Sequence, residues 1–182
     1  MPEKRLKTLS AWKSLAQEVE VLYAYPKDYK RTLIDRILHK IKIPRDANTL
    51  NKSIREACIS FEPDIVFIVK GVTVKPSTLK FIKARGIKSI SWSNDDMYSW
   101  HNRSLWYTLG LKQYDLVVTQ KSYNCNSNEL PSLGAKVLFQ DKAIDPDINY
   151  PVNNCKLFDC VHDVVFIGTK EQNRLEYLKY IA

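Results

Sequence analysis

The chain is poor in the residue patterns on which many catalytic and cofactor sites depend. Its 182 residues include only five glycines and three histidines, and neither a G-x-G-x-x-G fingerprint, a Walker loop nor a G-x-S-x-G elbow occurs. The four cysteines form no C-x-x-C pair, so free reduced thiols are expected. No apolar run approaches the roughly 20 residues that span a bilayer. P-loop chemistry, Ser-His-Asp hydrolysis, zinc sites and membrane-spanning helices are therefore not expected.

The composition is that of a globular protein, with 45% hydrophobic and 26% charged residues. The first seven residues carry positive charge but lack the apolar stretch of a secretory signal. We therefore expect a globular, cytoplasmic protein without a membrane span.

The net charge of +8 is concentrated toward the N-terminus. Residues 1–60 hold 13 of the Lys and Arg residues but only 7 of the Asp and Glu residues. Such an excess suits nucleic acid, an anionic membrane surface or phosphorylated substrates. The commoner explanation is a set of solvated helix faces, and no basic run is longer than two residues.

Apolar periodicity predicts helices that alternate with strands. Helices are expected at residues 3–17, 29–43, 46–60, 77–85, 100–109, 124–133 and 170–182, and strands at 19–23, 64–69, 87–92, 115–119, 136–139 and 163–167. Ser77 is a candidate N-cap, and Gly86, Gly110 and Gly134 are expected to end helices in the left-handed conformation. The continuous apolar run 64–69 indicates a strand buried on both faces. This alternation predicts an α/β fold with a Rossmann-like, doubly wound parallel sheet.

The most informative stretch is the end of the predicted strand 87–92, where apolar residues give way to Asn94, Asp95 and Asp96. In a parallel sheet the carboxyl ends of the strands face the crevice in which ligands bind. Two adjacent carboxylates there are costly unless they meet a ligand, a cation or hydrogen-bond donors. Asp95 and Asp96 are therefore our candidate catalytic residues. The alternative is that they cap a helix near Tyr98.

Three other predicted strands also end in polar residues. These are Lys70 after 64–69, Gln120 and Lys121 after 115–119, and Gln140 and Asp141 after 136–139. Together with Asn94 they offer oxygens that could hold sugar hydroxyls and lysines that could meet phosphate, so we take them as candidate cleft residues. Roughly half of such sets are simple caps and turns. Gly168 after the last strand resembles a phosphate-approach turn, although one glycine is a weak signal.

Several segments together resemble the glycosyltransferases of the B fold, and most closely the spore-maturation-protein-like glycosyltransferases. In chain order they are residues 64–71, 75–79, 92–96, 114–119, 133–135, 145–147, 150–151 and 163–169, followed by Arg174. The resemblance runs from about residue 1 to the end of the chain. No single motif carries it, and its specificity comes from the order and spacing of the segments.

The resemblance implies two Rossmann-like domains that face each other across a cleft. The N-terminal domain takes the acceptor, and the C-terminal domain takes a nucleotide-sugar donor, usually without a metal or other cofactor. Residues 1–156 then correspond to the acceptor-side domain. Residues 157–182 correspond to the first strand–helix unit of the donor side, where Gly168, Thr169 and Arg174 would contact the donor.

The chain departs from this pattern in two places. Its opening helix resembles the first helix of the family, so the first strand and its glycine-rich loop are expected to be missing. After Ala182 nearly the whole donor domain is also expected to be missing. We therefore expect little activity from the isolated chain, and self-association through an unpaired sheet edge. The competing interpretations are a non-catalytic α/β partner or binding module and, on the charge alone, a nucleic-acid-binding domain.

Overall fold

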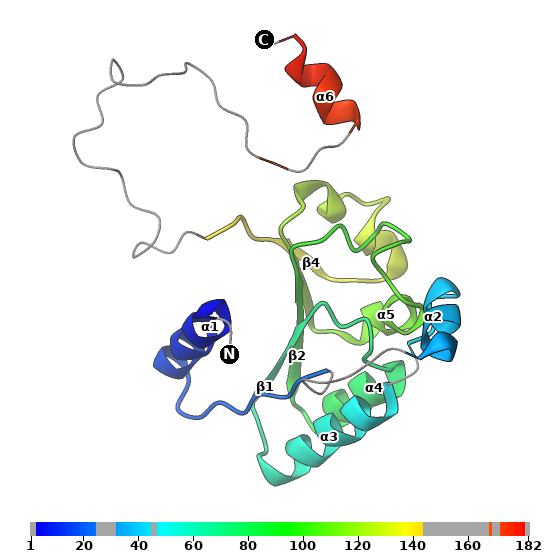
Figure 1. Ribbon diagram of the computed structural model, residues 1–182. Coiled ribbons are helices and arrows are strands. Elements are labelled where there is room, and N and C mark those ends of the chain that lie inside the picture. Colours follow the sequence, from blue (N-terminus) through cyan, green and yellow to red (C-terminus); the bar gives the residue numbers. More distant parts are fainter. Residues whose placement is uncertain (1–2, 25–31, 45–46, 144–167, 169–171, 181–182) are drawn as a thin grey trace, which may run out of the picture. The chain divides into compact units, whose positions relative to one another are not determined.

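The computed structural model describes residues 3–24, 32–44, 47–143, 168 and 172–180 (Figure 1). The chain forms two compact units, Met1–Lys142 and Ala143–Ala182, and each is described by itself. The expected domain boundary at residue 156 and the expected strand 163–167 lie outside the described residues. Within the part of the chain that the structure describes, no helix is long and apolar enough to cross a bilayer.

A four-stranded, all-parallel sheet is the centre of the first unit. Its strands are β1 (Ile65–Val69), β2 (Lys88–Ser93), β3 (Leu116–Thr119) and β4 (Val137–Phe139), in the spatial order β1-β2-β3-β4. The register pairs Val69 with Trp92, and Thr119 with both Ser93 and Phe139, so the carboxyl ends of the strands are level. This confirms the predicted α/β class with a sheet of Rossmann-like type.

Helices follow the predicted order but several are shorter than expected. They are α1 (Glu3–Leu15), α2 (Leu33–Lys40), α3 (Ala47–Ser60), α4 (Pro76–Ala84), α5 (Leu105–Gly110) and α6 (Gln172–Leu178). The helix predicted over 124–133 is instead two 3-10 turns, η2 (Ser122–Cys125) and η3 (Leu130–Leu133), because Pro131 cannot continue a helix begun before it. A third 3-10 turn, η1 (Leu111–Gln113), extends α5. Residues 19–23 form no strand, and residues 20–23 are exposed, so the alternation of apolar and polar residues there does not mark a strand.

Two predicted helix boundaries are also corrected. Helix α4 starts at Pro76 with Lys75 as N-cap, because proline suits the first helical position and Ser77 already lies inside the helix. Gly86 and Gly134 do adopt positive φ, at 76° and 84°. Gly110, at φ −84°, does not. A Cβ on Gly110 would lie 2.9 Å from Leu79 Cδ1, so close packing rather than a left-handed turn favours glycine there.

One face of the sheet carries the core. Figure 1 shows α3, α4 and α5 on the same side of the sheet. Right-handed crossovers in this strand order require this side for α4, between β1 and β2, and for α5, between β2 and β3. Leu79 and Ile82 of α4 are completely buried there. Along β2, Ser89, Ser91 and Ser93 point into this layer and are buried.

The other face of the sheet is more open. On β1, Ile65 and Val69 are exposed, which corrects the prediction that this strand is buried on both faces. Strand β1 forms one edge of the described sheet, and apolar runs alone do not distinguish an edge strand from a central one. The Trp12 ring of α1 lies 4.7 Å from the ring of Phe67 in β1.

The amino ends of β2 and β3 are joined by one carboxylate. Asp115 Oδ2 accepts hydrogen bonds from the Ser89 backbone N–H at 2.9 Å and from the Ser89 hydroxyl at 3.2 Å, and Lys88 Nζ lies 3.8 Å from Oδ1. The bond from the Ser89 backbone is the main cause that lowers the pKa of Asp115. A lowered pKa contributes stability above the ordinary carboxyl pKa, and this stability is lost as the pH falls through the folded-state pKa.

We predict that Asp115→Asn lowers the free energy of unfolding by about 1–2 kcal/mol at pH 7, because a charged hydrogen-bond acceptor is lost. The difference should be smaller at about pH 3 than at pH 7, because the stability that a lowered pKa contributes is lost progressively below the ordinary carboxyl pKa of about 4. Urea unfolding followed by circular dichroism at both pH values measures this. Asp64→Asn, at an exposed position one residue before β1, is the control and should change little. A difference between Asp115→Asn and the wild type that does not vary with pH would contradict the assignment.

Candidate functional site

The chain turns sharply where β1 ends. Lys70 and Gly71 both have positive φ, 67° and 63°, a conformation that is uncommon for a lysine. The Lys70 N–H donates to the Trp92 carbonyl at 2.7 Å, and the Gly71 N–H donates to the Val69 carbonyl at 2.8 Å. The turn therefore remains attached to β2. It also directs the Lys70 side chain toward the end of that strand, as its ion pair shows.

Gly71 is packed against buried side chains. A Cβ at this position would lie 2.6 Å from Tyr114 Oη and 3.3 Å from Ile68 Cγ2. Tyr114 and its neighbour Tyr107 are buried, with ring centroids 6.5 Å apart. The turn after β1 can therefore take this path only with glycine at position 71.

Hydroxyl groups gather beneath this turn. Burial raises the pKa of Tyr107 to about 12 and raises the pKa of Tyr114 further, while the nearby Ser91 hydroxyl opposes the shift in both. None of the three oxygens makes a hydrogen bond of good geometry with another described residue. Both tyrosines therefore stay neutral at physiological pH and serve as packing for the site.

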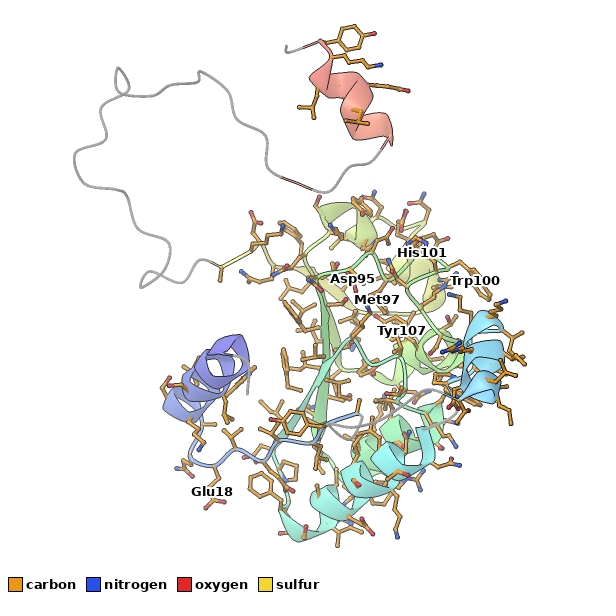
Figure 2. The ribbon with its side chains drawn as sticks, viewed as in Figure 1. Glu18, Asp95, Met97, Trp100, His101 and Tyr107 are labelled. Carbon is orange, nitrogen blue, oxygen red and sulfur yellow. The ribbon has the colours of Figure 1, made fainter. Side chains whose placement is uncertain are left out.

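Asp95 forms the centre of the candidate site. Its Oδ2 lies 2.5 Å from Lys70 Nζ, so an ion pair joins the carboxyl ends of β1 and β2. The side chains of Asp95 and Lys70 are 36% and 45% exposed, so solvent or a ligand can reach both. The Asp95 N–H donates to the buried Ser93 hydroxyl at 3.0 Å, which fixes the backbone from which the carboxylate projects. Figure 2 shows Asp95 at the end of the sheet.

Asp96 has a different role from its neighbour. Its Oδ1 accepts hydrogen bonds from the backbone N–H groups of Tyr98 and Ser99, at 3.1 and 3.2 Å, and from Asn124 Nδ2 at 2.9 Å. Asn124 is completely buried at the start of the β3–β4 connection. These contacts are those of a cap, which was the alternative considered for this residue. The capped segment is a turn and not a helix, because α5 begins only at residue 105.

Charge is concentrated around the Asn124 amide. Its Nδ2 also lies 3.4 Å from Glu129 Oε2, so two carboxylates share one amide group. Burial, and then Asp96 and Glu129, raise the pKa of Tyr123. The Asp96 carboxylate joins the loops after β2 and β3, and Glu129 binds the same amide from within the β3–β4 connection.

The other predicted cleft residues lie at the same edge without contacting one another. The Gln120 N–H donates to the Ser93 carbonyl at 3.3 Å, the Gln140 N–H to the Thr119 carbonyl at 2.9 Å, and the Lys121 N–H to the Thr119 hydroxyl at 3.1 Å. The side chains of Asn94, Gln120, Lys121 and Gln140 make no hydrogen bond or ion pair with any residue that the structure describes. Asp141 Oδ1 accepts only from the next backbone N–H, that of Lys142, at 2.7 Å.

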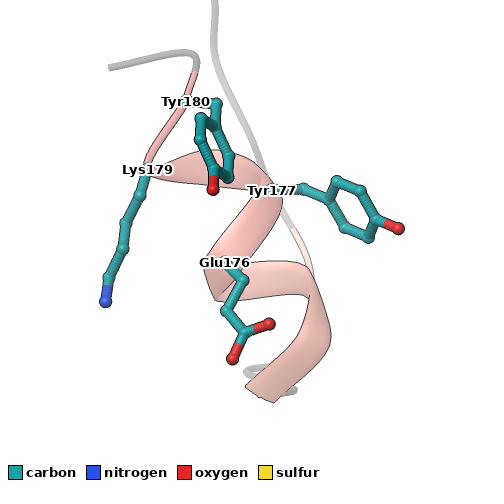
Figure 3. A pocket seen from close by; sticks show the side chains of 4 residues that line it. All are labelled: Glu176, Tyr177, Lys179 and Tyr180. Atoms are coloured by element: carbon teal, nitrogen blue, oxygen red, sulfur yellow. The ribbon is translucent and has the colours of Figure 1, made fainter.

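The predicted donor-side residues belong to the second unit. Gly168 is an exposed residue in a bend, and Thr169 lies outside the described residues. Arg174 is part of α6, but its side chain is outside the description. A hollow of about 630 Å³ lies beside α6 and is lined by Glu176, Tyr177, Lys179 and Tyr180. Figure 3 shows that these side chains point in different directions from the helix. One helical turn with diverging side chains does not enclose a ligand.

Sequence reasoning missed three residues that build the site: Gly71, Ser93 and Asn124. The alternation of Ser89, Ser91 and Ser93 in β2 was the available signal for a buried polar layer, since polar residues at every second strand position share one face. No local pattern marks Asn124 as buried, because asparagine is common in exposed turns.

An aromatic group flanks the site on the loop between β2 and α5. The Arg103 guanidinium lies 5.1 Å from the ring centroid of Tyr98 and 5.9 Å from that of Trp100. Cation–π contacts of this kind stiffen the loop that carries Asp95 and Asp96.

A second hollow, of about 500 Å³, lies at the opposite edge of the sheet between residues 62–65 and 85–88. The described residues contain no group of three or more His, Cys, Asp or Glu side chains that could hold a metal ion. Comparison with family models, curated proteins and solved structures found no match for this chain. The carboxyl edge with Lys70 and Asp95 is therefore the candidate site on geometry alone.

We predict that Gly71→Ala destabilises the protein more than Gly86→Ala does. Both glycines have positive φ, but nothing lies within 4 Å of a Cβ at Gly86. Gly86→Ala should therefore lower the free energy of unfolding only by the cost of a left-handed alanine, about 1 kcal/mol. Gly71→Ala adds the collision with Tyr114 Oη, about 1–3 kcal/mol more. Urea unfolding measures both variants.

The double variant Gly71→Ala/Tyr114→Phe is the specific control. Removing the Tyr114 hydroxyl takes away the colliding atom, so the double variant should recover most of the excess loss. Equal destabilisation by Gly71→Ala and Gly86→Ala, or no recovery in the double variant, would show that the turn tolerates a side chain.

Proposed function

We propose that this chain is the acceptor-side part of a cytoplasmic glycosyltransferase of the B fold, which transfers a sugar from a nucleotide-sugar to a hydroxyl acceptor. The observation that carries the proposal is the solvent-accessible Asp95 carboxylate, paired with Lys70 at the carboxyl edge of a parallel sheet. Ligands bind at this edge in open α/β sheets. The order of segments that resembles the spore-maturation-protein-like family supports the same conclusion.

In this proposal Asp95 is the general base. The acceptor hydroxyl oxygen bonds to the anomeric carbon of the donor sugar while the bond from that carbon to the diphosphate oxygen breaks. The hydroxyl proton passes to the Asp95 carboxylate, and the nucleoside diphosphate leaves. Lys70 holds the carboxylate in place through the ion pair.

The remaining polar side chains at the edge supply acceptor contacts. Asn94, Gln120 and Gln140 present amide groups without protein partners among the described residues, and Lys121 adds a cation. Such groups bind sugar hydroxyls by hydrogen bonds. Gly168, Thr169 and Arg174 remain our candidates for the donor diphosphate, and the proposal requires no metal or cofactor.

We predict that Asp95 and Asp96 respond differently to replacement by asparagine. Asp95→Asn should weaken binding of acceptor saccharides by about tenfold or more, because a charged hydrogen-bond acceptor for the sugar is lost, with an unchanged melting temperature. Asp96→Asn should lower the stability by about 1–3 kcal/mol, because the carboxylate accepts three hydrogen bonds. A glycan array and thermal unfolding measure the two effects.

Where transfer from a nucleotide-sugar is detected, Asp95→Asn should lower its rate by roughly 100- to 10,000-fold. Asp64→Asn is a suitable comparison, since it removes an exposed carboxylate before the amino end of β1, away from the candidate site. If Asp95→Asn retains saccharide binding and normal transfer, or loses them only because it unfolds, Asp95 is not the base.

A further inference from the structure

Helix α2 exposes its apolar side to solvent. Leu33, Ile34, Ile37 and Ile41 are 73%, 52%, 54% and 57% exposed, and together they form what we name the α2 surface. Leu33 and Ile37 are four residues apart and so lie along one side of the helix. Ile41 continues this spacing in the turn directly after α2, where its N–H donates to the Ile37 carbonyl at 3.4 Å. A helix of a soluble protein normally turns this stripe toward the core.

The exposure of the α2 surface is not caused by a frayed helix. At the start of α2, the Thr32 N–H donates to Asp35 Oδ2 at 2.8 Å, and the Asp35 N–H donates to Thr32 Oγ1 at 3.2 Å, which is a reciprocal cap. After the helix, the Ile43 N–H donates to the Leu38 carbonyl at 3.0 Å.

Two long-range bonds attach Lys42, in the turn directly after α2, to the rest of its unit. Lys42 Nζ donates to the His101 carbonyl at 3.0 Å, and the Leu105 N–H donates to the Lys42 carbonyl at 3.0 Å. The helix is therefore fixed beside the loop that carries the candidate site, with its apolar side outward.

The segment that carries the α2 surface is basic in sequence. Residues 30–45 include six Lys and Arg residues and a single acidic residue, Asp35. The Asp35 carboxylate is occupied by the cap, whereas Arg36 and Lys40 are exposed. A short helix with an apolar side and basic neighbours is typical of segments that lie in the surface of an anionic bilayer.

Further apolar side chains extend this surface. Trp100 is 61% exposed on the loop that accepts the Lys42 bond, and Leu105 and Leu109 of α5 are also exposed. Figure 2 shows Trp100 and His101 close to α2. Tryptophan is enriched at membrane–water boundaries because its ring is apolar and its N–H is polar.

The charge also argues against other occupants. If two copies of the chain paired through their α2 surfaces, two strongly basic segments would face each other, which is unfavourable. Nucleic acid would satisfy the cations but would leave the four aliphatic side chains uncovered. An anionic lipid surface satisfies both the apolar and the charged groups.

We propose that the α2 surface docks this protein onto an anionic phospholipid bilayer. The helix lies in the plane of the interface, with Leu33, Ile37 and Ile41 among the upper acyl chains and the basic side chains among the phosphates. The attachment is peripheral. It does not depend on the proposed sugar transfer, because none of its residues belongs to the Lys70–Asp95 site.

Co-sedimentation of the full chain with lipid vesicles tests the proposal. We expect binding to anionic vesicles of phosphatidylglycerol and phosphatidylcholine in about equal parts. Binding should be weaker at about 0.5 M salt, because salt screens the charges, and pure phosphatidylcholine vesicles should bind little protein. Ile37→Asp should weaken binding by about tenfold or more, since it places a carboxylate in the centre of the apolar surface. Lys40→Glu should weaken it by a similar factor, mainly at low salt.

Ile59→Asp is the matched control. Ile59 at the end of α3 is 54% exposed, as Ile37 is, so the two variants make the same change at equal exposure. It should leave vesicle binding unchanged, and all variants should keep the wild-type melting temperature. The proposal is overturned if the wild type does not bind anionic vesicles, if Ile59→Asp reduces binding as much as Ile37→Asp, or if the main effect of Ile37→Asp is to dissociate a lipid-independent dimer.

Discussion

The arrangement of the candidate site depends on one hydrogen bond, from the buried Asn124 amide to the Asp96 carboxylate. Asn124 lies at the start of the β3–β4 connection and Asp96 follows β2, so the bond fastens the loops after two neighbouring strands to each other. An unpaired amide or carboxylate at this depth would be costly, which makes other conformations of the two loops unfavourable. Asp96 is thereby held facing inward, and Asp95, one residue earlier, projects toward Lys70 and solvent.

The two adjacent carboxylates, Asp95 and Asp96, therefore have different roles. One carboxylate stabilises the loop by accepting three hydrogen bonds, and the other remains accessible beside a lysine held by a left-handed backbone. The strain at Lys70 is of the kind that persists when surrounding packing fixes it, here through Gly71 against Tyr114. The α2 surface lies beside the same loop, because Lys42 bonds to the carbonyl of His101. Membrane docking and ligand binding would then occur on neighbouring parts of the protein.

The sheet could be predicted from the sequence because it depends on local patterns. The strands at 64–69 and 87–92 are short apolar runs bounded by polar residues and glycine, and the structure places β1 and β2 within a residue of them. The position of Asp95 at a strand end followed from the same patterns. The separate roles of Asp95 and Asp96 could not be predicted, since they depend on Asn124, which is 28 residues away in sequence. The exposure of α2 was also beyond prediction, because its amphipathic pattern is the one that a buried helix would show.

Chemical-shift mapping on the ¹⁵N-labelled full chain tests the central claim most directly. On titration with acceptor saccharides and nucleotide-sugars, the account predicts that the largest saccharide-dependent shifts fall on the backbone amides of residues 70–72 and 93–96. In Asp95→Asn these shifts should need about tenfold more saccharide or more, while the rest of the spectrum is preserved. Saccharide shifts confined to other surfaces, or a complete lack of shifts at high ligand concentration, would contradict the claim that the Lys70–Asp95 edge binds sugar.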